Sequence, residues 1–297
     1  MHPHTASASA SATAVSCDDA LREPLALLEG RFAEGSVEVP GGRVSYRSCG
    51  SGPVVVLLHG ISSGAASWLQ CALKLESQAR VIAWNAPGYG RSTPLTMSQP
   101  KAVDYARRLQ DMLQALEVEQ CVLVGHSLGA LMAAAYLAHG DGRARRTLLA
   151  DPALGYGAAS KQERAHQVRE ERLGALRTLG IAGMAQKPTR LLSAHASAQD
   201  HAWVRWNMQW LDASGYTQAV QLLCGDDIAP YLQAAPRRGL SVACGAEDIV
   251  TTPQASEGLA RQFELPFKLV DAAGHACYIE QPSQFAALIS AQLTSTN

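Results

Sequence analysis

Apolar residues follow two alternating patterns along the chain. Short continuous apolar runs, such as 53–58 and 121–124, are typical of strands buried on both faces of a sheet. Longer segments between them, such as 103–116, repeat apolar residues at the spacing of one helix face. Strands that alternate with helices imply crossover connections and a mostly parallel central sheet flanked by helices. The sequence therefore predicts an α/β fold, with a hairpin at 35–47, strands at 53–58, 81–84, 121–124, 147–150, 240–243 and 267–270, and helices at 20–32, 68–77, 103–116, 128–138, 253–263 and 282–293.

The alternation is interrupted once. Residues 152–231 are mostly helical in pattern, without a convincing buried strand, and the strand pattern resumes only afterwards. A helical block inserted between two strands of one sheet is expected to cover the carboxyl edge of that sheet. We therefore predict an α/β core domain formed by residues 20–151 and 232–297, with a helical cap insertion at 152–231. The Ala- and Ser-rich residues 1–19 are expected to form a disordered tail.

Composition narrows the class of protein. The 297 residues are 47% apolar and 17% charged, which is a globular composition. With 25 basic and 26 acidic residues the net charge is −1, so no basic excess favours nucleic acid or a membrane surface as a partner. No apolar run approaches the ~20 residues of a membrane span, and no secretory signal pattern opens the chain. We expect a cytoplasmic protein with a small-molecule substrate, while the oligomeric state, including a homodimer, is left open.

The seven cysteines contain no CxxC pair and no Cys/His spacing typical of zinc. The expected state is therefore reduced, mostly buried thiols in a reducing compartment, and no metal site is predicted.

One short segment carries the main chemical signal. Gly125-His126-Ser127-Leu128-Gly129 fits the pattern G-x-S-x-G and lies directly between a predicted strand and a predicted helix. A serine in such a sharp turn projects its hydroxyl above the sheet, and the flanking glycines let strand and helix approach without a Cβ clash. The start of the helix adds unpaired N–H groups and the positive end of its dipole. Ser127 is therefore the predicted nucleophile.

The chain resembles the α/β-hydrolase family over about residues 35–295. The resemblance rests on four motifs in the order found in the family, namely His59-Gly60, the Ser127 turn, Gly245-Ala246-Glu247-Asp248 and Gly274-His275. It implies a triad in the chain order Ser, acid, His, with Ser127 as nucleophile, Asp248 as the acid and His275 as the base. Glu247, Asp226 and Asp227 are the competing candidates for the acid.

The resemblance also implies an oxyanion hole formed by two backbone N–H groups. One would come from Ile61, after the His59-Gly60 motif, and the other from Leu128, after the nucleophile. His59 and His126 are expected to orient and pack these loops at the edge of the substrate pocket.

Three tryptophans in the insertion share one helix face. Trp203, Trp206 and Trp210 are spaced i, i+3 and i+7. They are interpreted either as the core that attaches the cap or as one or more rings lining an apolar substrate pocket. The charged run 161–172 is interpreted as a solvated helix face.

The expected activity follows from the resemblance, which is to capped esterases, enol-lactonases and hydrolases of aromatic degradation. It implies hydrolysis of a small to medium carboxylic ester, thioester or lactone through an acyl-enzyme, without a metal or organic cofactor. One alternative is carbon–carbon bond hydrolysis of ring-cleavage diketones by the same triad. An alternative of another class is a non-catalytic receptor for a small molecule on the same scaffold.

Overall fold

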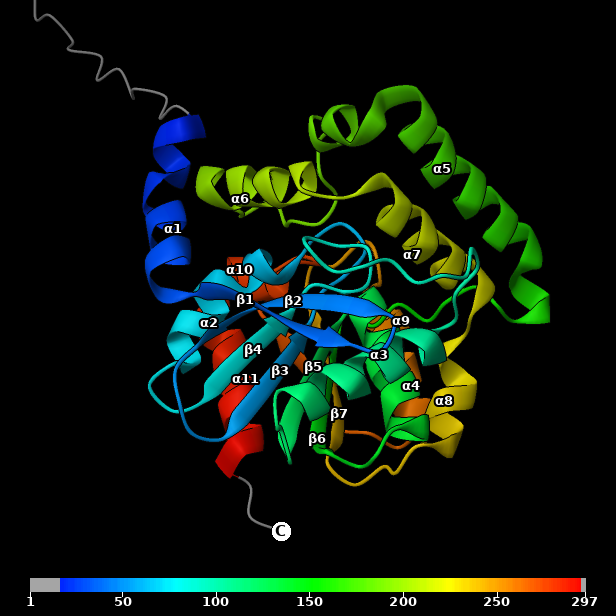
Figure 1. Ribbon diagram of the computed structural model, residues 1–297. Helices are drawn as coiled ribbons and strands as arrows, with labels where there is room; N and C mark the ends of the chain where they lie inside the picture. Colours follow the sequence, from blue (N-terminus) through cyan, green and yellow to red (C-terminus); the bar gives the residue numbers. More distant parts are fainter. Residues whose placement is uncertain (1–16, 295–297) are drawn as a thin grey trace, which may run out of the picture.

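The structure is a computed structural model that describes residues 17–294, and one sheet forms its centre (Figure 1). The eight strands of this sheet are β1 (Ala33–Val39), β2 (Gly42–Cys49), β3 (Val54–Leu58), β4 (Arg80–Trp84), β5 (Cys121–His126), β6 (Ala144–Ala150), β7 (Leu240–Gly245) and β8 (Phe267–Val270). Their order across the sheet is β1-β2-β4-β3-β5-β6-β7-β8. Strands β3 to β8 pair in parallel, whereas β1–β2 and β2–β4 are antiparallel. The predicted α/β fold is therefore confirmed.

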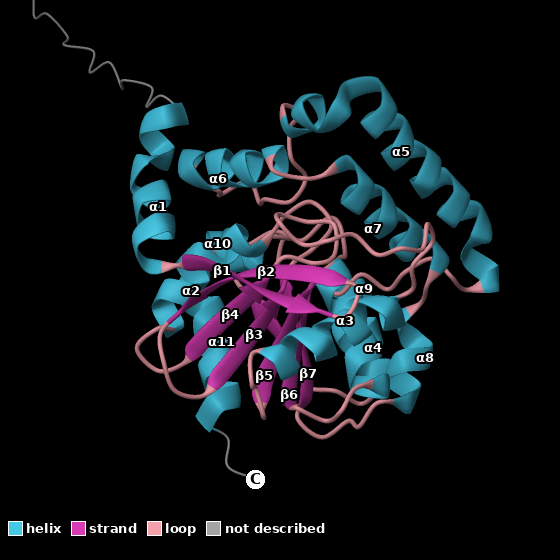
Figure 2. Cartoon of the chain, in the orientation of Figure 1, coloured by secondary structure: helices cyan, strands magenta, loops and turns pink. Residues whose placement is uncertain are grey.

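Helices cover both faces of the sheet (Figure 2). Each face has its own cluster of buried apolar side chains, which packs helices against strands. The first cluster includes residues of α3 (Ala102–Ala115), α4 (Leu128–His139), α8 (Ile228–Ala234) and α9 (Pro253–Gln262). The second includes residues of α1 (Cys17–Arg31), α2 (Leu69–Leu75), α10 (Cys277–Glu280) and α11 (Pro282–Thr294).

Strand β3 explains the continuous apolar run that begins near residue 53. Val56 and Leu58 belong to the cluster on one face, and Val55 and Leu57 to the cluster on the other. Successive side chains of a strand point to opposite faces, so a strand covered on both sides needs apolar residues at every position.

The insertion forms an arch over one end of the sheet. It contains the 3₁₀ turn η2 (Ala159–Lys161) and the helices α5 (Gln162–Ala185), α6 (Ala198–Gln209) and α7 (Ala213–Gly225), followed by α8. Figure 1 shows α5, α6 and α7 above the sheet, and Figure 2 shows loops gathered between them and the strands. Helix α8 lies beside α4 in the core layer, so α5 to α7 alone form the arch. The domain boundaries given above stay a prediction.

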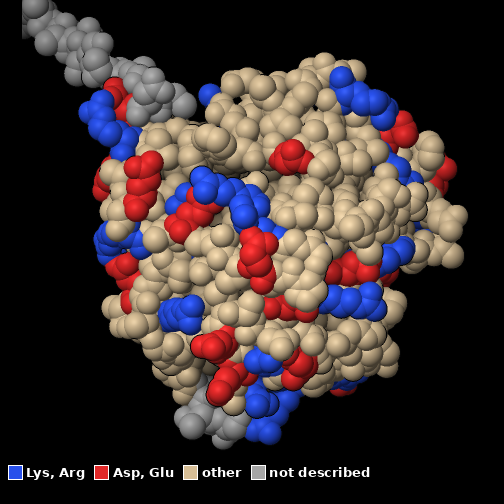
Figure 3. Space-filling view, viewed as in Figure 1, with Lys and Arg blue, Asp and Glu red and all other residues tan. Residues whose placement is uncertain are grey.

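The N-terminal part of the chain extends the second helical layer. Helix α1 begins at Cys17, so the last three residues of the segment expected as a tail are helical, and the other sixteen lie outside the described residues. Within residues 17–294 no helix has the length and apolar character needed to cross a membrane. Acidic and basic side chains are interspersed over the face seen in Figure 3, in keeping with the net charge of −1.

Candidate active site

Ser127 occupies a strained turn between β5 and α4. Its φ and ψ angles are 54° and −117°, in a region that residues with a side chain rarely adopt. The flanking glycines are required by contact, because a Cβ on Gly125 would lie 2.4 Å from the Gly129 carbonyl oxygen. A Cβ on Gly129 would lie 2.4 Å from the carbonyl oxygen of Leu58. The Ser127 N–H donates to Ala150 at the end of β6 (2.9 Å), which anchors the turn to the sheet.

Asp248 and His275 come from the loops after β7 and β8 and meet in a buried hydrogen bond. His275 Nδ1 lies 2.8 Å from Asp248 Oδ2. The other carboxylate oxygen accepts the N–H groups of Val250 (2.6 Å) and Thr251 (3.1 Å). The Thr251 hydroxyl also donates to Oδ2 (2.7 Å). Burial alone would raise the pKa of Asp248, but the hydrogen bond and charge of His275 and these donors hold that pKa well below its ordinary value.

Ser127 and His275 line the same small cavity beneath the arch. The cavity has a volume of about 50 Å³, and its lining residues come from the loops after β3, β5, β7 and β8 and from the arch. Within the part of the chain that the structure describes, the Ser127 hydroxyl forms no hydrogen bond with the His275 ring. Such contacts are often long in ligand-free sites and shorten when substrate binds. The arch contributes Arg172, Leu191, Val204 and Asn207 to the lining.

The two backbone N–H groups predicted as an oxyanion hole, of Ile61 and Leu128, differ in position, because Ile61 lines the cavity and Leu128 does not. Among the described residues, neither the amide of Ile61 nor that of Leu128 donates a hydrogen bond, and both residues border the turn of Ser127. The carbonyl of Ile61 is fixed by the hydroxyl of Tyr89 (2.9 Å), which sets the direction of this loop. Gly60 lets the loop approach closely, because a Cβ there would lie 3.0 Å from Ser127 Cβ and 3.4 Å from its Oγ.

His59 and His126 hold loops in place. His59 Nδ1 donates to the Gly60 carbonyl (2.8 Å), and its Nε2 accepts the N–H of Ala86 (3.0 Å). His126 Nε2 donates to the carbonyl of His275 (2.7 Å). Burial lowers the pKa of His59 to about 4 and that of His126 to about 3, so both rings are neutral at pH 7. His126 lines the cavity, whereas His59 lies behind it.

The tryptophan face of α6 points away from the cavity. Trp203 is 3% exposed and stacks on Trp206 with ring centroids 4.9 Å apart, and both belong to the cluster that includes α1. Trp210 is 67% exposed. From α6 the cavity is instead lined by Val204 and Asn207. None of the three rings lines this cavity, and the packing of Trp203 and Trp206 favours their interpretation as core, because the spacing fixes a shared face but not its partner.

The competing acids have other partners. Glu247 lies 3.4 Å from His195 at the surface. Asp226 accepts the N–H of Ala102 (2.7 Å) and so begins α3. One carboxylate oxygen of Asp227 caps the start of α8, and the other pairs with the amino group of Lys161 (2.8 Å). None of these three carboxylates lines the cavity that the described residues form around Ser127.

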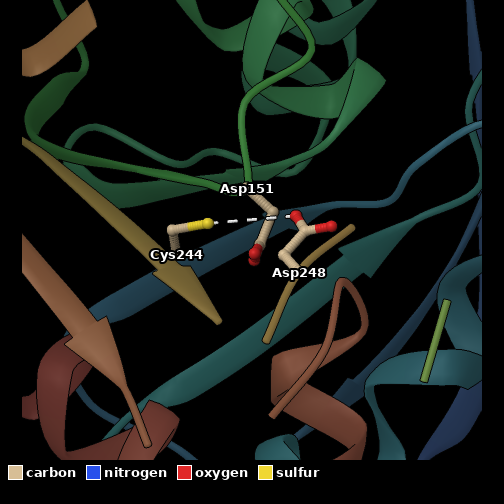
Figure 4. Close-up of side chains that lie close together, drawn as sticks. All are labelled: Asp151, Cys244 and Asp248. Carbon is tan, nitrogen blue, oxygen red and sulfur yellow. Dashed lines mark hydrogen bonds between the residues drawn. The ribbon is translucent and has the colours of Figure 1, made fainter. Parts of the chain in front are cut away.

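Asp151 was not anticipated from the sequence and lies behind the Asp248–His275 pair. It follows β6, is fully buried and groups with Cys244 and Asp248, as Figure 4 shows. Asp151 accepts the Gly245 N–H (2.8 Å) and the Cys277 thiol (3.0 Å), and burial raises its pKa to about 7. The spacing of the three groups would suit a metal ion, but Asp248 already binds four protein donors. We therefore describe the group as a hydrogen-bonded network.

Two further residues escaped sequence reasoning. Thr251 braces Asp248 from three positions downstream, and Arg172 turns from a charged helix face into the cavity. The position of Thr251, three residues after Asp248, is only a weak sequence signal for this contact. The position of Arg172 in the cavity depends on how α5 lies over the sheet, and a local sequence pattern does not predict that packing.

An eight-stranded, mostly parallel sheet with a serine in a strained strand-to-helix turn defines the α/β-hydrolase class. The family model for the alpha/beta hydrolase fold matches residues 53–282, and the chain belongs to this family.

Individual proteins also resemble this chain, and some of them are named as hydrolases or lactonases. An uncharacterized protein of Mycobacterium tuberculosis is 37% identical over 31% of this chain, which spans 26% of that relative's length. A 2-hydroxy-6-oxononadienedioate/2-hydroxy-6-oxononatrienedioate hydrolase of Dechloromonas aromatica is 29% identical over 40% of this chain and 42% of its own length. Among solved structures, the enol-lactonase of Burkholderia xenovorans LB400 aligns with a TM-score of 0.77 and 21% identity, covering 88% of this chain and all (100%) of that one.

Proposed function

We propose that the protein hydrolyses a small to medium carboxylic ester, thioester or lactone through an acyl-enzyme on Ser127. The observation that carries this proposal is that His275, hydrogen-bonded to Asp248, lines the same cavity as the Ser127 turn. Because His275 Nδ1–H points to Asp248, the lone pair of Nε2 is left for the serine proton.

The proposed reaction has two halves. Ser127 Oγ attacks the carbonyl carbon while His275 Nε2 takes its proton, and the carbonyl oxygen becomes an oxyanion facing the N–H groups of Ile61 and Leu128. Collapse breaks the bond to the leaving oxygen or sulfur, which receives the proton from His275. Water then attacks the acyl-enzyme with the same residues, releasing the carboxylic acid and free Ser127.

The cavity limits what this site accepts in the described conformation. A volume of about 50 Å³ holds only a few water molecules, since each needs roughly 10–15 Å³ by this measure, and drug-sized ligands occupy cavities of about 300 Å³ or more. A short acyl group therefore fits directly, whereas a larger substrate would extend beyond this cavity.

Active-site labelling and turnover test the proposal together. We expect a fluorophosphonate to label one serine per chain and a short-chain 4-nitrophenyl ester to be turned over. Ser127→Ala should abolish both, whereas Ser160→Ala, at an exposed serine of η2, should retain both. Turnover that survives Ser127→Ala would refute the mechanism. Labelling without turnover of any ester would favour a receptor.

The name of the Dechloromonas relative keeps carbon–carbon bond hydrolysis as a second candidate. The same triad could attack a ketone carbonyl and expel a carbon leaving group. A panel containing esters, lactones and a ring-cleavage diketone distinguishes the two, because the preferred class will show the higher kcat/KM.

A further inference from the structure

Arg172 is a charged group in an otherwise uncharged wall of the proposed catalytic cavity. It comes from α5 in the arch, and the loops of the core carry Ser127 and His275 opposite it. Among the described residues that line the cavity, Arg172 is the one with a permanent charge, and none is acidic. The lining therefore presents one positive group in the same cavity as Ser127 and His275, and no carboxylate among the described residues shares that lining.

The guanidinium of Arg172 is also largely unused. Its Nη1 donates to the neutral hydroxyl of Tyr216 at 3.3 Å, and no carboxylate within residues 17–294 forms an ion pair with it. Arg164 and Arg177 of the same helix differ in this respect, since each lies within 4.0 Å of a glutamate, whereas Arg169, outside the catalytic cavity, donates to the neutral amide of Gln221 (3.1 Å). A guanidinium has five N–H donors, and a partly buried cation without a counter-ion is unfavourable. Arg172 is thus poised to bind an anion.

A second, larger cavity continues the positive environment outward. Its volume is about 440 Å³, and it shares Ser62, Arg172, Leu191 and Val250 with the catalytic cavity. Its other charged residues are Arg164, Lys187, Arg190 and the single acid Glu171. A concave surface lined by an excess of one charge attracts ligands of the opposite charge and raises their rate of association. The route that leads to Ser127 therefore favours anions.

We infer that the substrate carries a carboxylate in addition to the bond that is cleaved, and that Arg172 binds this carboxylate. The inference rests on the proposed hydrolase function and specifies the substrate class: a half-ester, acidic lactone or similar acid. A carboxylate is planar and accepts two parallel N–H bonds from one guanidinium, which suits a single arginine in a cavity of about 50 Å³. A phosphate would call for more cationic partners than this cavity presents.

A matched pair of esters tests the inference. The substrates are 4-nitrophenyl hydrogen adipate, which ends in a carboxylate, and its neutral methyl ester. We expect Arg172→Gln to lower kcat/KM for the acidic ester about 10- to 100-fold, the range of a lost charge-assisted hydrogen bond, while the neutral ester changes less than about 3-fold. Arg172→Lys keeps the charge without the planar fork and should give an intermediate loss.

The control is Arg177→Gln, on the same helix but at the surface and outside both cavities. It should leave both kcat/KM values unchanged. Adipate should inhibit hydrolysis of the neutral ester competitively in the wild type, with a Ki that rises about 10-fold or more in Arg172→Gln.

The outcomes separate the inference from the function on which it rests. Equal losses on both esters in Arg172→Gln would assign Arg172 a structural role and overturn the inference. A wild type that does not prefer the acidic ester would also overturn it, while leaving ester hydrolysis established. Retained turnover of the neutral ester in Ser127→Ala would instead refute the proposed function.

Discussion

Replacing Asp248 by asparagine tests the proposed triad with a minimal change of shape. The amide has one oxygen and one NH₂ group where the carboxylate has two oxygens, so one of the two acceptor positions becomes a donor. At the Oδ1 position, the N–H groups of Val250 and Thr251 approach at 2.6 and 3.1 Å and cannot be reversed. At the Oδ2 position both partners can adapt, because an imidazole can change tautomer and the Thr251 hydroxyl also lies 2.9 Å from the carbonyl of Asp151. The NH₂ group should therefore face His275.

The consequence is a loss of the base. A donor opposite Nδ1 selects the imidazole tautomer with the proton on Nε2, which then cannot accept the proton of Ser127. We expect kcat for a short 4-nitrophenyl ester to fall about 10⁴-fold, as for the same change in serine protease triads, which corresponds to roughly 5 kcal/mol of activation free energy.

Steady-state kinetics, fluorophosphonate labelling and circular dichroism would be measured together on Asp248→Asn. The matched control is Glu247→Gln, the adjacent acid, which lies at the surface beside His195 and should keep kcat within a few-fold. A folded Asp248→Asn protein with kcat within 10-fold of the wild type would refute the assignment, and a large loss in Glu247→Gln would transfer the role to that residue.

Three further predictions follow from contacts around the site. Gly60→Ala places a methyl group 3.0 Å from Ser127 Cβ, and we expect it to lower kcat about 100-fold or more. Gly258→Ala, whose Cβ meets nothing within 4 Å, should leave kcat unchanged, and equal kinetics of the two variants would contradict the close approach. Burial raises the pKa of Asp151 to about 7, so the native state binds its proton more tightly than the unfolded chain and this carboxyl lowers stability as the pH rises from about 4 to 7. The free energy of unfolding of Asp151→Asn should therefore rise relative to that of the wild type between these pH values, by at most roughly 4 kcal/mol at 1.36 kcal/mol per pKa unit. Urea denaturation of both proteins at pH 4.5 and 8 measures this difference, and an equal difference at the two pH values would contradict the prediction. Trp203→Ala should reduce stability by about 3–5 kcal/mol and Trp210→Ala by less than about 0.5 kcal/mol, as measured by urea denaturation, with kcat/KM nearly constant in both; a changed acyl preference would restore the pocket interpretation.

The strands and most helices could be predicted because their signals are local. A strand such as β3 contacts helices on both faces and must be apolar throughout. Its five consecutive apolar residues are therefore enough to predict its buried position. Helix α10 was missed because its four residues are too few to show a helical period. The motif residues Ser127, Asp248 and His275 could be placed at the ends of strands, where parallel sheets bring their loops together.

The unpredicted parts of the site depend on contacts between distant elements. Arg172 belongs to a charged run, and its place in the lining of the cavity depends on how α5 packs over the core loops. Trp203 and Trp206 of α6 pack beside α1, which lies about 180 residues earlier in the chain. Asp151 joins Asp248 because β6 and β7 are neighbours, an order that the insertion between them conceals.

The backbone angles of Ser127 have a consequence for engineering. Its φ of 54° suits glycine, so replacing this serine by glycine would relax the turn while removing the proposed nucleophile. Heat tolerance and catalysis are thus in conflict at this one position. A library of variants selected only for survival at high temperature would be free to discard the reactive hydroxyl, and each round of such a selection should include an assay for turnover.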